Sequence, residues 1–230
     1  MEQNFWTDRW AEGRTGWHAS KPNPQLVDEL HRLDCSAGDA ILVPLSGATL
    51  DLRWLRDEAG LRPIGVEWAE RAVEATFEEL GEQPHRIPLA PEVELWHSKD
   101  LAVLCADWFA VAPAHLAAAV AATGAPAPCR AWWDRAALIA LPPELRPRYA
   151  AQLLKLMPSG ARGLLLALEY PEGEMQGPPF CVEPAEVREL FEGATDLLEL
   201  AQIDALAQSP KRQEQGLTRL DERLYFLIRN

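Results

Sequence analysis

Short apolar runs alternate with helix-like stretches from residue 40 to the end of the chain, and this alternation limits the possible folds more than any other feature. The runs are residues 40–45, 63–67, 101–107, 129–133, 163–170, 197–204 and 223–229. Helix-like stretches lie at residues 50–58, 68–80, 143–157 and 183–191, with Thr49 and Gly81 as cap signals. Such alternation predicts an α/β fold, in which a mostly parallel sheet is covered by helices on both faces.

The last two apolar runs break the alternation because no clear helix separates them. Residues 197–204 and 223–229 both have a strand-like composition. An antiparallel pair that closes the sheet is the simplest interpretation, and it brings the expected number of strands to about seven.

The segment before residue 40 has a different character. Trp6 and Trp10 are four residues apart, so they share one face if this stretch is helical. Such a pair either packs in the core or forms a lid over a pocket, and both interpretations stay open. With 230 residues and 48% apolar side chains, we expect a single domain, with residues 1–39 as a lid or cap and residues 40–230 as the core.

Charge and composition exclude several classes of partner. The formal net charge of −13 would repel a nucleic-acid backbone and an anionic membrane surface. The N-terminus is polar and no apolar run reaches the roughly 18–20 residues that span a bilayer. The four cysteines have no metal-pair spacing, so we expect reduced thiols, no metal, and a cytoplasmic protein that works as a monomer on a small molecule.

The turn after the first run predicts a ligand site. In "VPLSGATLD" (43–51), Gly47 lets a ligand approach the backbone, and Glu67 ends the next run 20 residues later. A carboxylate at that strand end suits the two hydroxyls of a ribose. The phosphate-binding G-x-G-x-x-G pattern is missing, which favours a cofactor without phosphate, such as S-adenosylmethionine, over a dinucleotide. Asp107 ends a third run, where it could accept a hydrogen bond from an adenine amino group.

Several blocks together resemble one known family. They are "FWTDRWAEGRTGWH" (5–18), "VPLSGATLDLRWL" (43–55), "GVE" (65–67), "WDRAALIALPPELRPRYA" (133–150), "LEYPEGEMQGPPF" (168–180) and "GLTRLDERLYFL" (216–227). In this order, and over nearly the whole chain, they are similar to the bacterial thiopurine S-methyltransferases. The resemblance implies a Rossmann-like, seven-stranded S-adenosylmethionine-dependent methyltransferase fold with an N-terminal helical lid, and S-adenosylhomocysteine as the by-product.

The resemblance also implies roles for individual residues. It places the aromatic residues of the lid, the turn after the first apolar run and the acidic residue that binds the ribose around the cofactor. It places the arginine of the WDR block close to the cofactor and to the acceptor pocket. The implied cofactor-binding residues are Trp6, Trp10, Leu45, Gly47, Glu67, Asp107 and Arg135.

Two positions depart from the usual family pattern. Where relatives have PLCGKS or a similar turn, this chain has Ser46 and Ala48, so a cysteine and a lysine are absent. Trp17 stands where a phenylalanine is usual, beside His18. The missing positive charge predicts that the acceptor preferred by relatives need not be preferred here.

The expected chemistry is an in-line displacement at a sulfonium methyl group, which demands alignment and exclusion of water. Arg135 either stabilises an anionic acceptor or is locked by Asp134 in an ion pair. His18 either assists proton removal or is structural. The resemblance implies that Trp17 and Phe180 are walls of the acceptor pocket, although the "GPPF" stretch equally suits a rigid loop.

Three functions follow from these observations. The first is methylation of the sulfur or selenium of a small, aromatic or heterocyclic thiol. The second is methylation of another small acceptor, such as a chalcogen oxyanion or a ring nitrogen. The third is a catalytically silent protein that binds S-adenosylmethionine, an alternative that the altered first turn keeps open.

Overall fold

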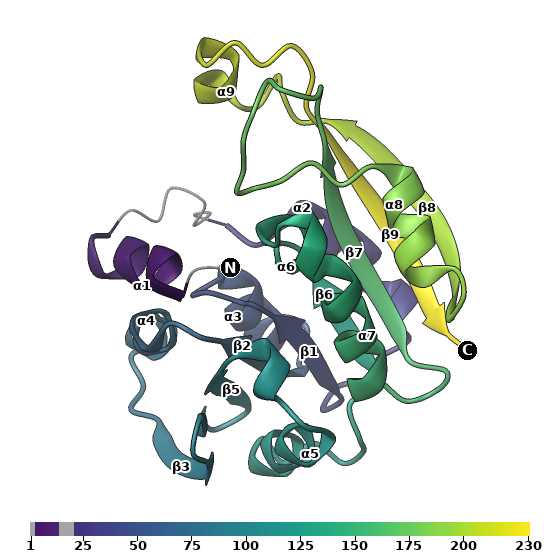
Figure 1. Cartoon of the computed structure of the whole chain (residues 1–230). Helices are drawn as coiled ribbons and strands as arrows, with labels where there is room; N and C mark the ends of the chain where they lie inside the picture. The colour runs from purple at the N-terminus through teal and green to yellow at the C-terminus, as the bar shows by residue number, and fades with distance from the viewer. Residues whose placement is uncertain (1–2, 14–20) are drawn as a thin grey trace.

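One mixed sheet organises the computed structural model, which describes residues 3–13 and 21–230 (Figure 1). The strand order is β3-β4-β5-β2-β1-β6-β7-β9-β8. The strands are β1 Ala40–Pro44, β2 Arg62–Glu67, β3 His85–Ala90, β4 Val93–Ser98, β5 Leu101–Ala106, β6 Ala131–Asp134, β7 Arg162–Glu169, β8 Thr195–Asp204 and β9 Asp221–Arg229.

The seven strands expected from the sequence are all present, and the expected parallel core is confirmed. β1 pairs in parallel with β2 and β6, and the parallel pairing continues to β5 on one side and to β7 on the other. β9 runs antiparallel to both β7 and β8, so the predicted antiparallel closure is also confirmed.

The expected count of seven strands was wrong, because residues 3–13 and 21–230 form a sheet of nine strands. The two extra strands, β3 and β4, form an antiparallel hairpin that extends the sheet beyond β5. β3 is exposed over its first four residues and contains Pro88. It therefore lacks both the apolar run and the alternation that identify a strand in a sequence, and edge strands are where proline is tolerated.

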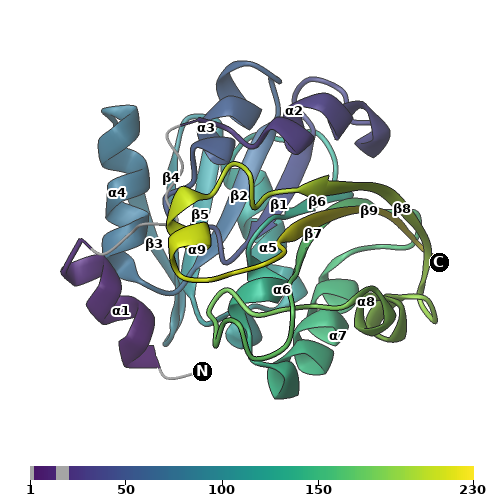
Figure 2. The same ribbon diagram turned by 90° about the horizontal axis from the view of Figure 1, so that it is seen from above.

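The helices form two layers, one on each face of the sheet (Figure 2). The helices are α1 Gln3–Ala11, α2 Pro24–Glu29, α3 Leu50–Asp57, α4 Glu70–Leu80, α5 Pro113–Ala122, α6 Ala137–Ala140, α7 Arg146–Leu156, α8 Pro184–Phe191 and α9 Pro210–Glu214. Apolar side chains of α2, α3 and α4 fill one core layer, and those of α5, α6, α7 and α8 fill the other.

The four helices expected from the sequence are present with small shifts of their ends. Thr49 caps α3 by accepting a hydrogen bond from the amide of Asp51, and Gly81 ends α4 in the left-handed conformation. The short α9, which the sequence analysis did not expect, lies between β8 and β9; Ser209 precedes it and Pro210 begins it, and both residue types are common at helix starts. Within the described residues, no helix has both the length and the apolar character to cross a membrane.

A buried carboxylate ties the N-terminal segment to the core. Asp51 on α3 is 2% exposed. Its Oδ1 accepts a hydrogen bond from the amide of Asn23 at 2.7 Å, and its Oδ2 accepts one from the indole of Trp133 on β6 at 2.8 Å. Three separate parts of the chain therefore meet at one side chain, and this fixes how α2 docks against the sheet.

A second buried carboxylate, Asp134, ends β6. It is fully buried, and its Oδ1 accepts hydrogen bonds from the amides of Ala137 and Leu138 at the start of α6. The hydroxyl of Tyr149 on α7 donates to Oδ2 at 2.6 Å. Asp134 therefore neither pairs with Arg135 nor reaches a cavity, which corrects the expectation that it is a catalytic residue: its oxygens are used to fix the turn that follows β6.

We predict that the free energy of unfolding of Asp134→Asn, relative to that of wild type, increases as the pH rises. Burial raises the pKa of the Asp134 carboxyl from 3.8 to about 6. Between these values the native state holds a proton that the unfolded state has released, so the contribution of Asp134 to the free energy of unfolding falls with rising pH. Asparagine keeps the shape and the Oδ1 acceptor without this titration.

Urea unfolding of both proteins at about pH 5.5 and about pH 7.5 checks this prediction. Tyr149→Phe, which leaves Oδ2 without its donor, is the matched control and should lose roughly 1–2 kcal/mol at the higher pH. An equal difference in stability between wild type and Asp134→Asn at the two pH values would contradict the prediction.

Candidate functional site

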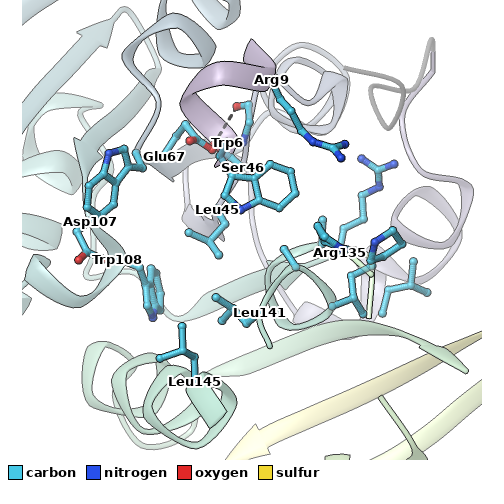
Figure 3. Close-up of a pocket in the computed structure, with 18 of the residues that line it drawn as sticks. Trp6, Arg9, Leu45, Ser46, Glu67, Asp107, Trp108, Arg135, Leu141 and Leu145 are labelled. Atoms are coloured by element: carbon cyan, nitrogen blue, oxygen red, sulfur yellow. Dashed lines mark hydrogen bonds between the residues drawn. The ribbon is translucent and has the colours of Figure 1, made fainter. Parts of the chain in front are cut away.

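A cavity of about 610 Å³ opens at the carboxyl ends of the parallel strands (Figure 3). It lies beside β1, where the chain turns from adding strands on the β2 side to adding strands on the β6 side. Ligands of open α/β sheets bind at such a switch point. The cavity walls come from α1, the turn after β1, the ends of β2 and β5, the segment 135–148, β7, β9 and the loop before α8. The polar and aromatic residues among them are Trp6, Arg9, Trp10, Ser46, Glu67, Trp68, Asp107, Trp108, Phe109, Arg135, Arg148 and Glu222.

The turn after β1 presents its backbone to the cavity. Leu45 and Gly47 both have positive φ, 45° and 55°, so the chain reverses sharply. The amide of Ser46 donates to the carbonyl of Val66, which anchors the turn to β2. A Cβ at position 47 would lie 3.2 Å from the indole of Trp10. Glycine is therefore favoured here both for its backbone conformation and for the close approach of the Trp10 indole.

Glu67 at the end of β2 supports this turn. Its Oε2 accepts a hydrogen bond from the amide of Gly47 at 2.8 Å, and its Oε1 accepts one from the amide of Ala69 at 2.7 Å. Burial raises the pKa of the Glu67 carboxyl, while these backbone donors act in the opposite direction. The amide of Trp68 also acts on this carboxylate. A carboxylate has about four acceptor positions, so acceptor capacity remains for a ligand hydroxyl.

Asp107 and Trp108 form the wall beyond the end of β5. Oδ1 of Asp107 accepts a hydrogen bond from the amide of Phe109 at 3.0 Å, which starts a short 3₁₀ turn over Trp108–Ala110. Trp108 is 2% exposed and packs against Tyr149. Asp107 lines the cavity beside Glu67 (Figure 3), so two carboxylates stand at this end of the site.

The helix α1 contributes a separate wall. Trp6, Arg9 and Trp10 all line the cavity, as expected for positions i, i+3 and i+4 of one helical face. Figure 3 shows the guanidinium groups of Arg9 and Arg135 reaching toward one another from α1 and from the end of β6. The end of the cavity opposite Asp107 is therefore rich in positive charge.

The "GPPF" stretch lines the cavity with its prolines and not with its aromatic ring. Pro178 and Pro179 are part of the wall, and Phe180 is not. The amide of Phe180 donates to the carbonyl of Ile139 at 2.7 Å, and its ring lies near the guanidinium of the buried Arg146. This corrects the expectation for Phe180: its backbone is tied to α6, and its ring faces Arg146 behind the wall.

The structure thus brings together Trp6, Trp10, Leu45, Gly47, Glu67, Asp107 and Arg135 around one cavity. The two other expected site residues, Trp17 and His18, lie outside the described residues. In the described part of the chain, no group of three or more His, Cys, Asp and Glu side chains is arranged to hold a metal ion.

Sequence reasoning missed several lining residues, among them Arg9, Trp108 and Glu222. Arg9 had a usable signal, because it is three residues from Trp6 on the same helical face. Trp108 directly follows the strand end at Asp107. Glu222 gave no local signal, since its place depends on the register of β9 against β7.

The full chain, residues 1–230, matches the family described as thiopurine S-methyltransferase (TPMT). Thiopurine S-methyltransferase of Pseudomonas paraeruginosa is 42% identical over 229 residues, which cover 100% of both chains. Thiopurine S-methyltransferase of Bordetella parapertussis is 40% identical over 229 residues, which cover 100% of this chain and 99% of that one.

Solved structures share the fold at low sequence identity. The 1,6-didemethyltoxoflavin-N1-methyltransferase of Burkholderia thailandensis, solved with S-adenosylhomocysteine, matches with a TM-score of 0.61 at 13% identity, over 99% of this chain and 87% of that one. The [4+2]-cyclase SpnF matches with a TM-score of 0.59, also at 13% identity, over 99% and 92%.

Because one of these two structures is a cyclase, the fold alone does not determine the reaction. The evidence for the reaction comes from the sequence matches, which extend from end to end at about 40% identity. They show that this chain belongs to the thiopurine S-methyltransferase family, whose enzymes take the methyl group from S-adenosylmethionine.

Proposed function

We propose that this protein transfers the methyl group of S-adenosylmethionine to the sulfur, or selenium, of a small aromatic or heterocyclic thiol. The observation that carries the proposal is the full-length similarity to proteins named thiopurine S-methyltransferase. The cavity supports it: the carboxylates of Glu67 and Asp107 lie toward one end, which we assign to the donor, and the guanidinium groups of Arg9 and Arg135 lie toward the other, which we assign to the acceptor.

The residues of the donor end fit an adenosine without phosphates. Glu67 has acceptor capacity left for a ribose hydroxyl, and Asp107 offers a carboxylate beyond the next strand end for an adenine amino group. Leu45 and Gly47 expose backbone at the turn. Among the described residues, the basic side chain near this end is Arg148, whose guanidinium stacks on the ring of Phe109.

The indoles of Trp6 and Trp10 can attract the sulfonium of the donor from the helix α1. When bound, the donor supplies the methyl group as an electrophile on a positively charged sulfonium. An aromatic face attracts such a cation by roughly 0.5–2 kcal/mol. Both tryptophans line the cavity from α1, so they can favour the charged donor over its neutral by-product and keep water from the reacting atoms.

Arg135 faces the acceptor end from the turn that Asp134 fixes. A thiol reacts as its thiolate, and a fixed guanidinium near that sulfur lowers the cost of the negative charge before transfer. The apolar wall around it, from Leu141, Leu168 and Pro178, suits an aromatic ring.

The two departures from the family turn have different positions. Ser46 lines the cavity, and its hydroxyl donates to the carbonyl of Gly47 at 3.1 Å. Ala48 is 2% exposed and is not part of the wall. Of the two departures, Ser46 is therefore the one whose side chain a bound ligand can contact directly.

A methylation assay tests the proposal directly. The purified protein is incubated with S-adenosylmethionine and, in turn, with aromatic thiols, heterocyclic thiols, selenite, tellurite and ring-nitrogen acceptors, and products are identified by mass spectrometry. We expect S-methylated products. Turnover of only the oxyanions or ring nitrogens would contradict the proposal, as would binding of the donor without turnover of any acceptor.

We predict that Glu67→Ala weakens S-adenosylhomocysteine binding by roughly 10- to 100-fold. The change removes a hydrogen bond to a charged acceptor, which contributes about 1.5–3 kcal/mol. Isothermal titration calorimetry measures the affinity. Glu74→Gln on the exposed face of α4 is the control and should bind like wild type, while an affinity of Glu67→Ala within about twofold of wild type would exclude the ribose role.

We predict that Arg135→Ala lowers kcat/KM for an aromatic thiol by roughly 100-fold, because one oriented charge next to the reacting centre is removed. Stability should change far less, since the turn is held by Asp134. Steady-state kinetics and thermal unfolding provide the two measurements. Arg130→Ala, an exposed arginine at the opposite end of β6, is the matched control, and equal activity of Arg135→Ala and Arg130→Ala would contradict the role.

A further inference from the structure

Glu222 is an acidic residue of the acceptor end for which the proposed function has no use. It lies on β9 directly opposite Leu168 of β7, and both residues line the cavity. Directly opposed residues of an antiparallel pair project from the same face of the sheet. The register therefore directs the Glu222 carboxylate into the cavity.

The neighbours of Glu222 on β9 project from the other face. There Arg223 forms ion pairs with Glu169 of β7 and with Glu199 of β8 at 2.5 and 2.6 Å. Asp221 accepts a hydrogen bond from Gln202 and pairs with Arg219. This end of the strand thus has an ion-pair network on one face and Glu222 alone on the other.

Glu222 has no such network among the described residues, because none of them forms a hydrogen bond or a direct ion pair with its carboxylate. Arg135 is the charged group that acts on it, through space. On the adjacent strands the opposed residues are the apolar Leu168 and Ile203. A carboxylate that faces a cavity, without a structural partner, is available to a ligand.

The surroundings of Glu222 make it a suitable base. Burial raises the pKa of its carboxyl above the ordinary value, and Arg135 acts in the opposite direction. A general base is more effective as its pKa approaches the pH at which the enzyme works. The other charged residues that line the cavity are Arg9, Arg148, Glu67 and Asp107, and the last two belong to the donor end.

We propose that Glu222 is a catalytic base that accepts the proton of the acceptor, so that the protein methylates thiols that are not ionised at neutral pH. The proposal rests on the proposed function. The S–H bond breaks as its proton passes to an Oε of Glu222, and Arg135 faces the thiolate. The thiolate electron pair forms the new S–CH₃ bond, while the old C–S bond breaks and leaves its electron pair on the donor sulfur. The proton then leaves Glu222 for solvent.

Two thiols of similar size distinguish this role from a structural one. A nitro-substituted thiophenol is almost fully ionised at neutral pH and needs no base, whereas benzyl mercaptan is not ionised and does. With Glu222→Gln we expect kcat/KM for benzyl mercaptan to fall roughly 100-fold and kcat/KM for the thiophenol to change less than about threefold. Glu222→Asp, which keeps a carboxylate, should recover part of the lost rate.

A second measurement does not depend on turnover. Ultraviolet difference spectra of benzyl mercaptan bound with S-adenosylhomocysteine should show the thiolate band with wild type and lose it with Glu222→Gln. Glu199→Gln, on the far side of the sheet, is the matched control and should behave like wild type in both measurements.

The outcomes separate the two proposals. Equal loss of activity toward both thiols, or no loss toward either, would overturn the role of Glu222 and leave the methyltransferase function intact. If wild type methylates neither these two thiols nor any other thiol, the proposed function itself fails, and the proton route fails with it.

Discussion

The hydrogen bonds of Glu67 are the constraint on which the rest of the site depends. One carboxylate holds the amide of Gly47 after β1 and the amide of Ala69 after β2, so the ends of two adjacent strands have a fixed spacing. Because the turn is fixed, Gly47 can pack under Trp10, and α1 gains a surface to dock on. The helix α1, the turn after β1 and the carboxylate that we propose for ribose binding are therefore parts of one arrangement, held by a group that is almost fully buried.

Those features that depend on local patterns could be predicted from the sequence. Seven strands, their parallel core and the antiparallel closure follow from apolar runs and from the missing helix between the last two. The cavity residues at strand ends, such as Glu67 and Asp107, follow from the rule that ligands bind at the carboxyl edge of a parallel sheet. The edge strand β3 could not be predicted, because an exposed edge strand buries too little apolar surface to require a regular pattern. Its partner β4 has buried Val93, Leu95 and Trp96, a short local signal that the sequence analysis missed.

Features that depend on long-range geometry could not be predicted either. Asp134 and Arg135 are adjacent in sequence, yet the first is fully buried under the turn while the second lines the cavity. Phe180 was favoured over its proline neighbours because it is aromatic, but a backbone hydrogen bond to α6 places the prolines in the wall. Glu222 enters the site through the register between two strands, about which no single stretch of sequence gives information.

The two edge strands of the sheet affect the tendency of the protein to aggregate. β3 has a register irregularity between Pro88 and Ala90, and β8 has one between Glu199 and Ala201. An uninterrupted outer strand is a template on which another chain can add, whereas bulges and proline interrupt the ladder of free amides. The register irregularities in the two edge strands thus disfavour edge-to-edge aggregation of the open sheet, while its central strands stay regular.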